Sequence, residues 1–299
     1  MSMPNFLIIG AAKSGTTALY EYLKAHPQIY TSPIKEPKFF GLEGEKLNFQ
    51  GPDDEKANNT IITNIKAYQS LFQGVSNETA IGEASPWYLY LHKAPIQIYK
   101  YMPQVKLIAI LRNPADRAYS NFLHQCQYCA EPLTDFAQAL REEDTRMHSN
   151  WRPFWHYKQL GFYYVQLKRY FELFDRSQIR VYLYEELCDH PIDLLQDIFC
   201  FLGVDDRFIP DISKKYNVTF IPKNHPLRTV YSQPNFISFI QSLFSNTISD
   251  HCNNFKKSSI KPLSLKVRKQ LIEEYRQDIL QLQELIQQDL SHWLTCEIH

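Results

Sequence analysis

The 299-residue sequence lacks several features that would assign it to a class at once. It carries no net charge, with 32 basic and 32 acidic side chains, so broad attraction to nucleic acid or an anionic membrane is not expected. No apolar run approaches the roughly 20 residues that span a bilayer. The N-terminus lacks the charged, apolar and small-residue segments of a secretory signal. These absences predict a soluble protein of the cytoplasm, or a domain cut from a larger protein.

Glycine is scarce and cysteine follows no pattern. The chain has 9 glycines but 19 tyrosines and 19 phenylalanines, which excludes a disordered or fibrous protein. Its 6 cysteines are irregularly spaced, which favours reduced thiols over a disulfide framework. Cys126-x-x-Cys129 has no second pair at zinc spacing, so we predict no metal site.

Short apolar runs alternate with helical patterns along the chain. The runs Phe6 to Ile9, Leu107 to Leu111 and Ile179 to Leu183 are typical of strands buried on both faces of a parallel sheet. Helices are predicted at Thr16 to Ala25, Asp116 to Gln127, about Tyr163 to Phe174, and Asp193 to Leu202 with Gly203 as C-cap. This alternation predicts a three-layer, P-loop-like α/β domain with a central parallel sheet flanked by helices.

The rest of the chain gives weaker signals. Leu271, Tyr275, Ile279, Leu282, Ile286 and Leu290 have the spacing of an amphipathic helix. Residues 41–60 are polar and turn-rich and are predicted to form a surface excursion. We find no repeat or linker, so we predict one domain over residues 1–299.

The stretch GAAKSGTT, residues 10–17, follows the first apolar run. Its glycines have the spacing of a Walker A loop, but Thr16 stands where that motif has its lysine, and Lys13 lies inside the loop. A loop between a buried strand and a helix N-terminus presents free backbone N–H groups, so we predict an anion site rather than only a capped turn. Gly15 lets the backbone come close, the hydroxyls can donate, and the lysine adds charge. The candidate ligands are Lys13, Ser14, Gly15, Thr16 and Thr17.

The second run continues as LIAILRNPADRAYSNFLH, residues 107–124. Arg112 stands directly after the apolar residues, where a Walker-type enzyme would have an aspartate for Mg²⁺. An arginine at the carboxyl end of a parallel strand suits a phosphate monoester, and Ser120 would help to hold the same group. The alternative is an ion pair between Arg112 and Asp116. Two anion sites without the aspartate argue against ATP hydrolysis.

Together, K-S-G-T-T (residues 13–17) and R-N-P-x-x-R-A-Y-S (residues 112–120) resemble the sulfotransferases that use 3′-phosphoadenosine 5′-phosphosulfate. The likeness is greatest to the heparan sulfate sulfotransferase-like branch and its bacterial relatives. It implies that the first segment binds the 5′-phosphosulfate, with Lys13 facing the bridging oxygen, and that Arg112 and Ser120 bind the 3′-phosphate. It also implies metal-independent transfer of a sulfuryl group to an acceptor hydroxyl, which yields a sulfate ester and adenosine 3′,5′-bisphosphate.

Other segments extend the resemblance. K-E-P-K-F-F, residues 35–40, resembles the family's K-E-P-x-F-F segment and implies that Glu36 is the general base. His124 lies four residues after Ser120, on the same helix face, and is either a second acid/base group or a core hydrogen-bonding residue. Two further nucleotide contacts are implied, Tyr163 in G-F-Y-Y-V-Q-L and Lys223 in a basic loop near the end of the chain.

The acceptor segment departs from the family. The heparan sulfate enzymes have E-K-T-P where this chain has Glu83-Ala84-Ser85-Pro86. The missing lysine and zero net charge disfavour a highly sulfated polysaccharide, and the aromatic residues that follow favour a neutral or apolar acceptor. We therefore expect a small-molecule, glycan or carrier-bound hydroxyl, with a carrier protein as a possible partner. The alternatives are a P-loop-like kinase or nucleotide hydrolase, and a non-catalytic nucleotide-binding partner protein.

Overall fold

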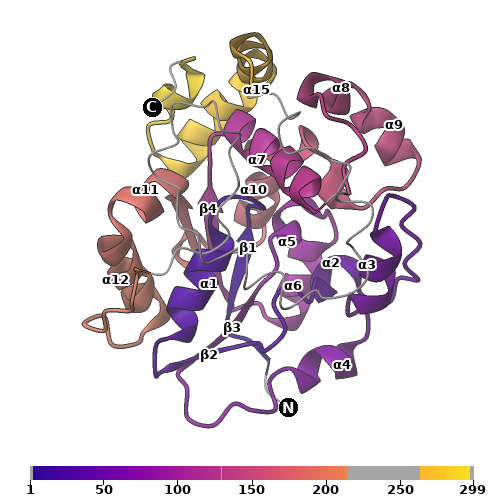
Figure 1. Ribbon diagram of the computed structural model, residues 1–299. Coiled ribbons are helices and arrows are strands. Elements are labelled where there is room, and N and C mark those ends of the chain that lie inside the picture. The colour runs from indigo at the N-terminus through magenta and orange to yellow at the C-terminus, as the bar shows by residue number, and fades with distance from the viewer. Residues whose placement is uncertain (1–2, 129, 214–262, 297–299) are drawn as a thin grey trace.

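One parallel β-sheet organises the chain in the computed structural model, which describes residues 3–128, 130–213 and 263–296 (Figure 1). Its five strands are β1 (Phe6–Gly10), β2 (Ile29–Thr31), β3 (Ala80–Ala84), β4 (Lys106–Leu111) and β5 (Ile179–Leu183). They lie in the order β2-β3-β1-β4-β5, and every neighbouring pair is parallel. The predicted α/β class with a central parallel sheet is confirmed.

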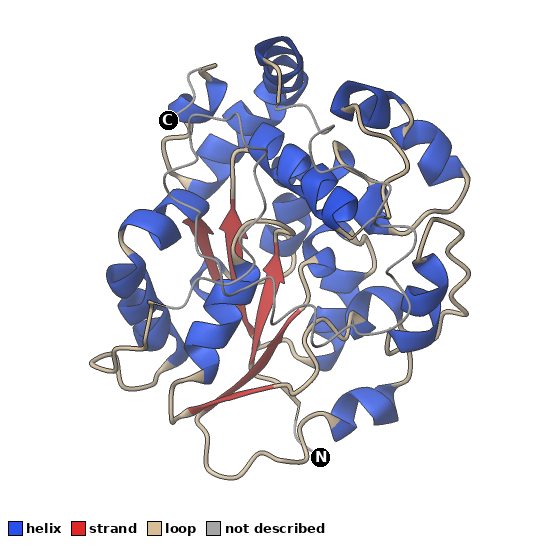
Figure 2. Cartoon of the chain, viewed as in Figure 1, coloured by secondary structure: helices blue, strands red, loops and turns tan. Residues whose placement is uncertain are grey.

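Helices cover both faces of this sheet because alternate strand residues point to opposite faces (Figure 2). In β1, Leu7 and Ile9 enter one hydrophobic cluster, and Phe6 and Ile8 enter another. The second cluster is covered by α1 (Thr16–Lys24), α11 (Tyr184–Asp189) and α12 (Pro191–Leu202). The first is covered mainly by α5 (Trp87–Tyr90), α6 (Ala94–Tyr101), α7 (Pro114–Gln127), α10 (Tyr163–Phe171) and α15 (Leu265–Ile286). The result is the predicted three-layer arrangement.

Short helices complete the described part of the chain. They are α2 (Phe39–Leu42), α3 (Asp54–Thr60), α4 (Ile65–Ser70), α8 (Phe136–Arg141) and α9 (Glu143–His148). Single turns of 3-10 helix occur at Pro153–Trp155, Gln159–Gly161, Arg176–Gln178 and Ser291–Leu294. Within residues 3–128, 130–213 and 263–296, no helix is both long and apolar enough to cross a membrane.

The predicted elements form close to their expected bounds. Helix α7 begins two residues earlier than expected because Asn113 caps it, accepting a hydrogen bond from Ala115 N at 3.0 Å, while Pro114 occupies the first turn. The two strands β2 and β3 were not predicted. The first is three residues long, and in the second Gly82 and Glu83 interrupt the apolar run.

The predicted surface excursion is only partly correct. Residues 41–60 include α3 and several exposed side chains, but Asp54 at the start of that helix is fully buried. The segment is therefore anchored to the body of the protein. Lys223 and the rest of residues 214–262 lie outside the described residues, as does Cys129.

The strand order places a crevice at the carboxyl ends of β1 and β4. These strands are neighbours, but the chain after β1 returns toward β2 and β3, whereas the chain after β4 continues toward β5. The connections leave in opposite directions, which opens the sheet edge to a ligand at this point. The two predicted anion motifs follow β1 and β4 directly, so the fold brings them to this crevice.

Candidate active site

The loop between β1 and α1 has the geometry of an anion cradle. Gly15, immediately before the first helical residue, has φ 89° and ψ 4°, a conformation that L side chains rarely adopt. A Cβ there would lie 2.6 Å from Leu187 Cδ2, so only glycine fits. The Ser14 side chain is fully buried, and its hydroxyl makes no well-formed hydrogen bond within the described residues. The first N–H groups of α1 face the same end of the loop.

Arg112 joins this loop to the second motif. Its Nη1 donates to the carbonyl oxygen of Lys13 at 3.4 Å, and its guanidinium lies 4.7 Å from the ring centre of Tyr184. The alternative ion pair with Asp116 is wrong, because Asp116 accepts a hydrogen bond from Arg268 Nη2 at 2.9 Å instead. In the described part of the chain, no carboxylate pairs with Arg112. Its guanidinium therefore has no ion pair within 4.0 Å among those residues, although it acts electrostatically on Glu185.

Tyr163 and Ser120 lie beside the two motifs. The Tyr163 hydroxyl donates to the backbone oxygen of Arg112 at 3.0 Å, and its side chain is fully buried. Burial raises the pKa of Tyr163 to about 12, so the hydroxyl keeps its proton. Ser120 is buried on α7, on the helix that Asn113 caps. Asn113 Nδ2 also donates to Trp293 O at 3.3 Å, which ties the C-terminal segment to the second motif.

Glu36 lies between two lysines. Its Oε1 is 2.6 Å from Lys35 Nζ and its Oε2 is 3.2 Å from Lys38 Nζ, yet 32% of the side chain is exposed. Glu36 and Lys38 both have positive φ, at 62° and 59°. Non-glycine residues occupy this region only when the surroundings hold them there. The holding contacts come from the end of β3: Glu36 N donates to Ala84 O at 3.0 Å, and Lys38 N donates to Ser85 Oγ at 3.0 Å.

The charges in the cleft act on one another. Burial would raise the pKa of Glu36, but Lys35 and Lys38 outweigh it and hold that pKa well below its usual range. Burial, together with the nearby Arg112 guanidinium, lowers the pKa of Lys13 to about 8, and Glu36 opposes this change. The site therefore combines a carboxylate that is ionised at neutral pH with an excess of positive charge that favours binding of an anion.

His124 projects from α7 toward this group. Its ring lies 5.3 Å from the ring of Phe154 and 4.7 Å from that of Tyr128. Burial and the positive charge of Lys13 lower the pKa of His124 to about 3. The imidazole is therefore neutral at neutral pH, which suits a hydrogen-bonding group better than a cationic acid. A catalytic role for it is still a prediction.

Sequence analysis placed Glu83 in the acceptor segment but assigned it no role in the site. The Glu83 side chain is buried next to the Glu36 loop, with 1% exposure. Its carboxyl accepts hydrogen bonds from Ser85 Oγ at 2.9 Å and Tyr68 Oη at 3.3 Å. Burial raises the pKa of Glu83 to about 7, despite those hydrogen bonds, and the Glu36 charge adds to the rise. An acidic residue in the otherwise uncharged strand AIGEA was the available signal.

An aromatic wall stands beside the two lysines. Lys38 Nζ lies 4.5 Å from the ring centre of Trp87, a cation–π distance. Phe49 meets the same indole at right angles, with ring centres 6.5 Å apart. Asn58 holds the Phe49 backbone by two hydrogen bonds of 2.9 Å, one to its N–H and one to its carbonyl oxygen. The segment 43–60 thus contributes to the outer side of the cleft.

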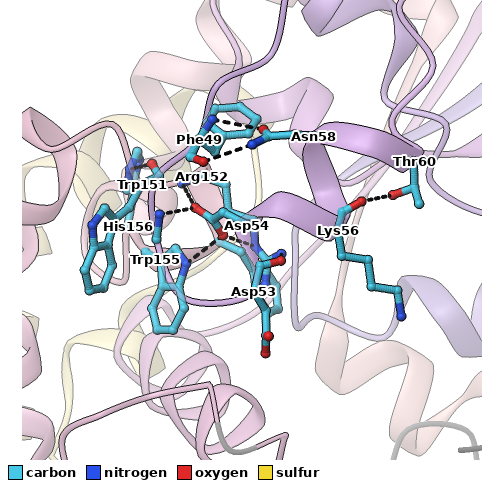
Figure 3. Close-up of polar contacts among 12 residues, drawn as sticks. Phe49, Asp53, Asp54, Lys56, Asn58, Thr60, Trp151, Arg152, Trp155 and His156 are labelled. Carbon is cyan, nitrogen blue, oxygen red and sulfur yellow. Dashed lines mark hydrogen bonds and ion pairs between the residues drawn. The ribbon is translucent and has the colours of Figure 1, made fainter. Parts of the chain in front are cut away.

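Asp54 fixes this segment to the chain after α9 (Figure 3). Its carboxylate accepts hydrogen bonds from Gly51 N at 2.9 Å, Arg152 N at 2.8 Å and Trp155 Nε1 at 3.1 Å. Arg152 Nε also lies 3.1 Å from Oδ1. On the same segment, His156 Nδ1 lies 2.9 Å from the Tyr90 hydroxyl and Nε2 lies 3.1 Å from Trp151 O. Two distant segments therefore share one fully buried carboxylate.

Comparison with known proteins assigns the family. The family model described as "Sulfotransferase domain" matches residues 3–291, so the chain belongs to the sulfotransferase family. The mouse (Mus musculus) bifunctional heparan sulfate N-deacetylase/N-sulfotransferase 4 is 32% identical over 215 residues, which is 69% of this chain and 23% of that protein. Human (Homo sapiens) carbohydrate sulfotransferase 15 is 26% identical over 247 residues, 68% of this chain and 44% of that protein. The chain thus spans less than half the length of these relatives.

A solved structure agrees over the full chain. The sulfotransferase from Alicyclobacillus acidocaldarius is 33% identical, with a TM-score of 0.78, and the match covers 99% of this chain and 100% of that one. The family and fold predicted from the two anion motifs are confirmed.

Proposed function

We propose that the protein transfers a sulfuryl group from 3′-phosphoadenosine 5′-phosphosulfate to an acceptor hydroxyl. The observation that carries this proposal is the junction of the two anion motifs, where Arg112 contacts the backbone of Lys13 and no described carboxylate neutralises it. A Walker-type site has a lysine for the phosphates in its loop and an aspartate for Mg²⁺ after a second strand. Here the residue that directly follows β4 is Arg112. Sulfotransferases of this family use this donor.

The residues present fit such a donor. The buried Ser14 hydroxyl, which has no well-formed partner in the described residues, and the first N–H groups of α1 would hold the 5′-phosphosulfate together with Lys13, Gly15, Thr16 and Thr17. Arg112 and Ser120 would hold the 3′-phosphate, with Tyr163 fixing the Arg112 backbone. When bound, the donor supplies an activated sulfuryl group. Lys223 is proposed as a further contact, although it lies outside the described residues.

The protein's own residues supply the base and the electrostatics. Glu36 would accept the acceptor's proton, since it is ionised and partly exposed. Lys13 would stabilise the charge that develops on the leaving oxygen, a preorganised interaction of the kind that dominates such transfers. His124, neutral and within electrostatic range of both, would orient the acceptor hydroxyl.

For the acceptor we propose a neutral hydroxyl compound, such as a small molecule, a glycan or a carrier-bound chain. The names of two relatives refer to heparan sulfate and carbohydrate. This chain has Ala84 at the place of the heparan sulfate enzymes' lysine, and the aromatic pair Phe49 and Trp87 stands beside the base. Both features favour an uncharged acceptor surface over a polyanion.

Calorimetry with adenosine 3′,5′-bisphosphate, beside ATP with Mg²⁺, tests the donor site. We expect wild-type protein to prefer the bisphosphate, and Arg112→Ala to weaken its binding by about 10- to 100-fold, the effect of losing charge-assisted hydrogen bonds. Arg276→Ala is the matched control, because Arg276 is partly exposed on α15 and pairs with Glu273. Preference for ATP with Mg²⁺, indifferent to Arg112, would indicate a kinase or hydrolase instead. Bisphosphate binding without transfer to any hydroxyl would indicate a non-catalytic binding protein.

A further inference from the structure

The arrangement around Glu36 is a poor one for a base. Each carboxylate oxygen contacts a separate ammonium group, Lys35 at 2.6 Å and Lys38 at 3.2 Å. Two cations stabilise the ionised form and so reduce its tendency to accept a proton. A general base works best when its pKa lies near the operating pH. Efficient proton transfer to Glu36 would therefore require at least one of these lysines to move away.

The two lysines are not equivalent, since Lys38 is fixed from several sides. Its ammonium lies over the Trp87 ring at 4.5 Å, and its backbone N–H donates to Ser85 Oγ at 3.0 Å. The Ser85 hydroxyl is in turn fixed by its own hydrogen bond to Glu83 at 2.9 Å. Only 16% of the Lys38 side chain is exposed. Movement of Lys38 would break the cation–π contact as well as the ion pair.

Lys35 has one partner and faces the donor loop. Among the described residues, its ammonium makes its hydrogen bond to Glu36 alone, and 22% of its side chain is exposed. It is close enough to Lys13 and His124 that its charge lowers the pKa of each. Lys35 therefore has one hydrogen-bond partner among the described residues, the Glu36 carboxylate, and acts electrostatically on Lys13 in the donor loop.

The charges around Glu36 favour a move of Lys35 from the Glu36 carboxylate to an anion bound in the loop after β1. Lys13, Lys35 and Arg112 are mutually repelling cations, and the groups that face Glu36 besides these are Lys38, His124 and Glu83. A single carboxylate offsets this positive charge only in part. An anion of higher charge in the loop would compete with Glu36 for the Lys35 ammonium, which has no second hydrogen bond among the described residues.

We propose that Lys35 is a cation shared between base and donor: in the donor-free protein it pairs with Glu36, and on donor binding it moves to the sulfuryl oxygens, which leaves Glu36 to take the acceptor's proton. This inference rests on the proposed function and adds to it a coupling between donor binding and the base. The proton of the acceptor hydroxyl passes to Glu36 Oε1, the oxygen that Lys35 vacates. The hydroxyl oxygen forms its bond to sulfur as the bond from sulfur to the phosphate oxygen breaks, and that oxygen keeps the electron pair.

A binding comparison tests the proposal without measuring turnover. Adenosine 3′,5′-bisphosphate lacks the sulfuryl group that 3′-phosphoadenosine 5′-phosphosulfate has, so the ratio of their affinities reports the sulfuryl contacts. We expect Lys35→Met to weaken phosphosulfate binding by about tenfold or more and bisphosphate binding by less than about threefold, as for loss of one charge-assisted hydrogen bond. Lys35→Arg keeps the charge and should restore most of the difference. Lys38→Met should leave the ratio unchanged.

Titration of Glu36 by carbon-13 NMR, assigned with Glu36→Gln, gives a second readout. In wild-type protein the pKa of Glu36 should rise by about one unit or more with phosphosulfate but not with bisphosphate. In Lys35→Met it should already be raised without ligand. Equal loss of both affinities in Lys35→Met, or no ligand-dependent change at Glu36, would overturn the proposal and leave the function intact. Failure of wild-type protein to bind either nucleotide would instead overturn the proposed function.

Discussion

Two glutamates, Glu83 in β3 and Glu36 in the loop that hydrogen-bonds to the end of β3, have opposite surroundings. Glu36 lies in the cleft, with 32% of its side chain exposed and two lysines on its carboxylate. Glu83 is 1% exposed, and the groups that act on its carboxyl are hydroxyls, those of Ser85, Tyr68 and Tyr88. For both, burial raises the pKa, but the lysines reverse the effect at Glu36, whereas hydroxyls cannot do so at Glu83.

The end of β3 therefore supports one carboxyl group that can be protonated near neutral pH, Glu83, and one that is ionised, Glu36. The backbone oxygen of Ala84 holds the N–H of Glu36, and Ser85 links Glu83 to the N–H of Lys38. Glu83 can be protonated near neutral pH and still hold Ser85 in place, because a protonated carboxyl both donates and accepts hydrogen bonds. Glu36, in contrast, has to be ionised to act as a base. We infer that Glu83 supports the loop and that Glu36 performs the chemistry.

The largest expected effect separates the two glutamates in turnover. Glu36→Gln removes the proposed base while keeping the shape of the side chain, so kcat should fall by about 10²- to 10⁴-fold. Glu83→Gln keeps a neutral hydrogen-bonding group in the lower position, so kcat should fall by less than about tenfold. Both variants should bind adenosine 3′,5′-bisphosphate with affinities near that of wild-type protein, since neither residue belongs to the predicted phosphate contacts. Equal losses of turnover in the two variants would remove the distinction between base and support.

The next effect concerns a third carboxylate, Asp54, which is as buried as Glu83 but is held by N–H donors from Gly51, Arg152 and Trp155. Asp54→Ala leaves these donors and the Arg152 charge without their acceptor, so we expect a loss of about 3 kcal/mol in the free energy of unfolding. Urea denaturation measures it.

Glu55→Ala is the control for Asp54, because Glu55 is exposed on the same helix. We expect its denaturation midpoint to match that of wild-type protein. If Asp54→Ala unfolds at the same urea concentration as Glu55→Ala, the network of Figure 3 contributes little to stability.

These carboxylates also show how far the sequence could predict the site. The donor side follows from local order: a loop after one buried strand, an arginine after another, and the rule that parallel strands end at a common edge. The acceptor side depends on contacts such as Asp54 with Trp155, 101 residues apart. Polar residues in 41–60 indicate a surface loop equally well whether one of them is buried or not. Sequence analysis named Glu83 in the acceptor segment but did not predict its burial, because only packing shows it.

A smaller effect is the pH dependence that Glu83 gives to stability. Its pKa is raised by burial from the ordinary 4.5 to about 7, so the folded protein binds this proton more tightly than the unfolded chain. The stabilisation is fully present below about pH 4.5 and is lost as pH rises through about 7. Complete ionisation should cost on the order of 3 kcal/mol.

Urea denaturation at pH 5 and pH 8 measures this dependence in wild-type protein and Glu83→Gln. Burial also raises the pKa of Glu143 to about 7 and that of Asp278 to about 6, but these groups are common to both proteins. The difference between the two proteins therefore isolates Glu83, and Glu83→Gln should gain stability relative to wild type as pH rises. A difference that does not change with pH would mean that Glu83 is ionised in the folded protein throughout this range.

The smallest expected effect comes from the longer of the two hydrogen bonds to Glu83. Tyr68 donates to it at 3.3 Å, while its ring stacks on Phe39 with centres 4.6 Å apart. Tyr68→Phe keeps the ring contact and removes one donor that lowers the pKa of Glu83. The free energy of unfolding should fall by about 1 kcal/mol or less at pH 8, where the carboxylate loses a partner, and by less at pH 5. The pKa of Glu83 should rise by roughly half a unit, since one unit corresponds to about 1.4 kcal/mol. A fall in that pKa would mean that the phenol stabilises the protonated carboxyl instead, and that the two glutamates differ for a reason other than their donors.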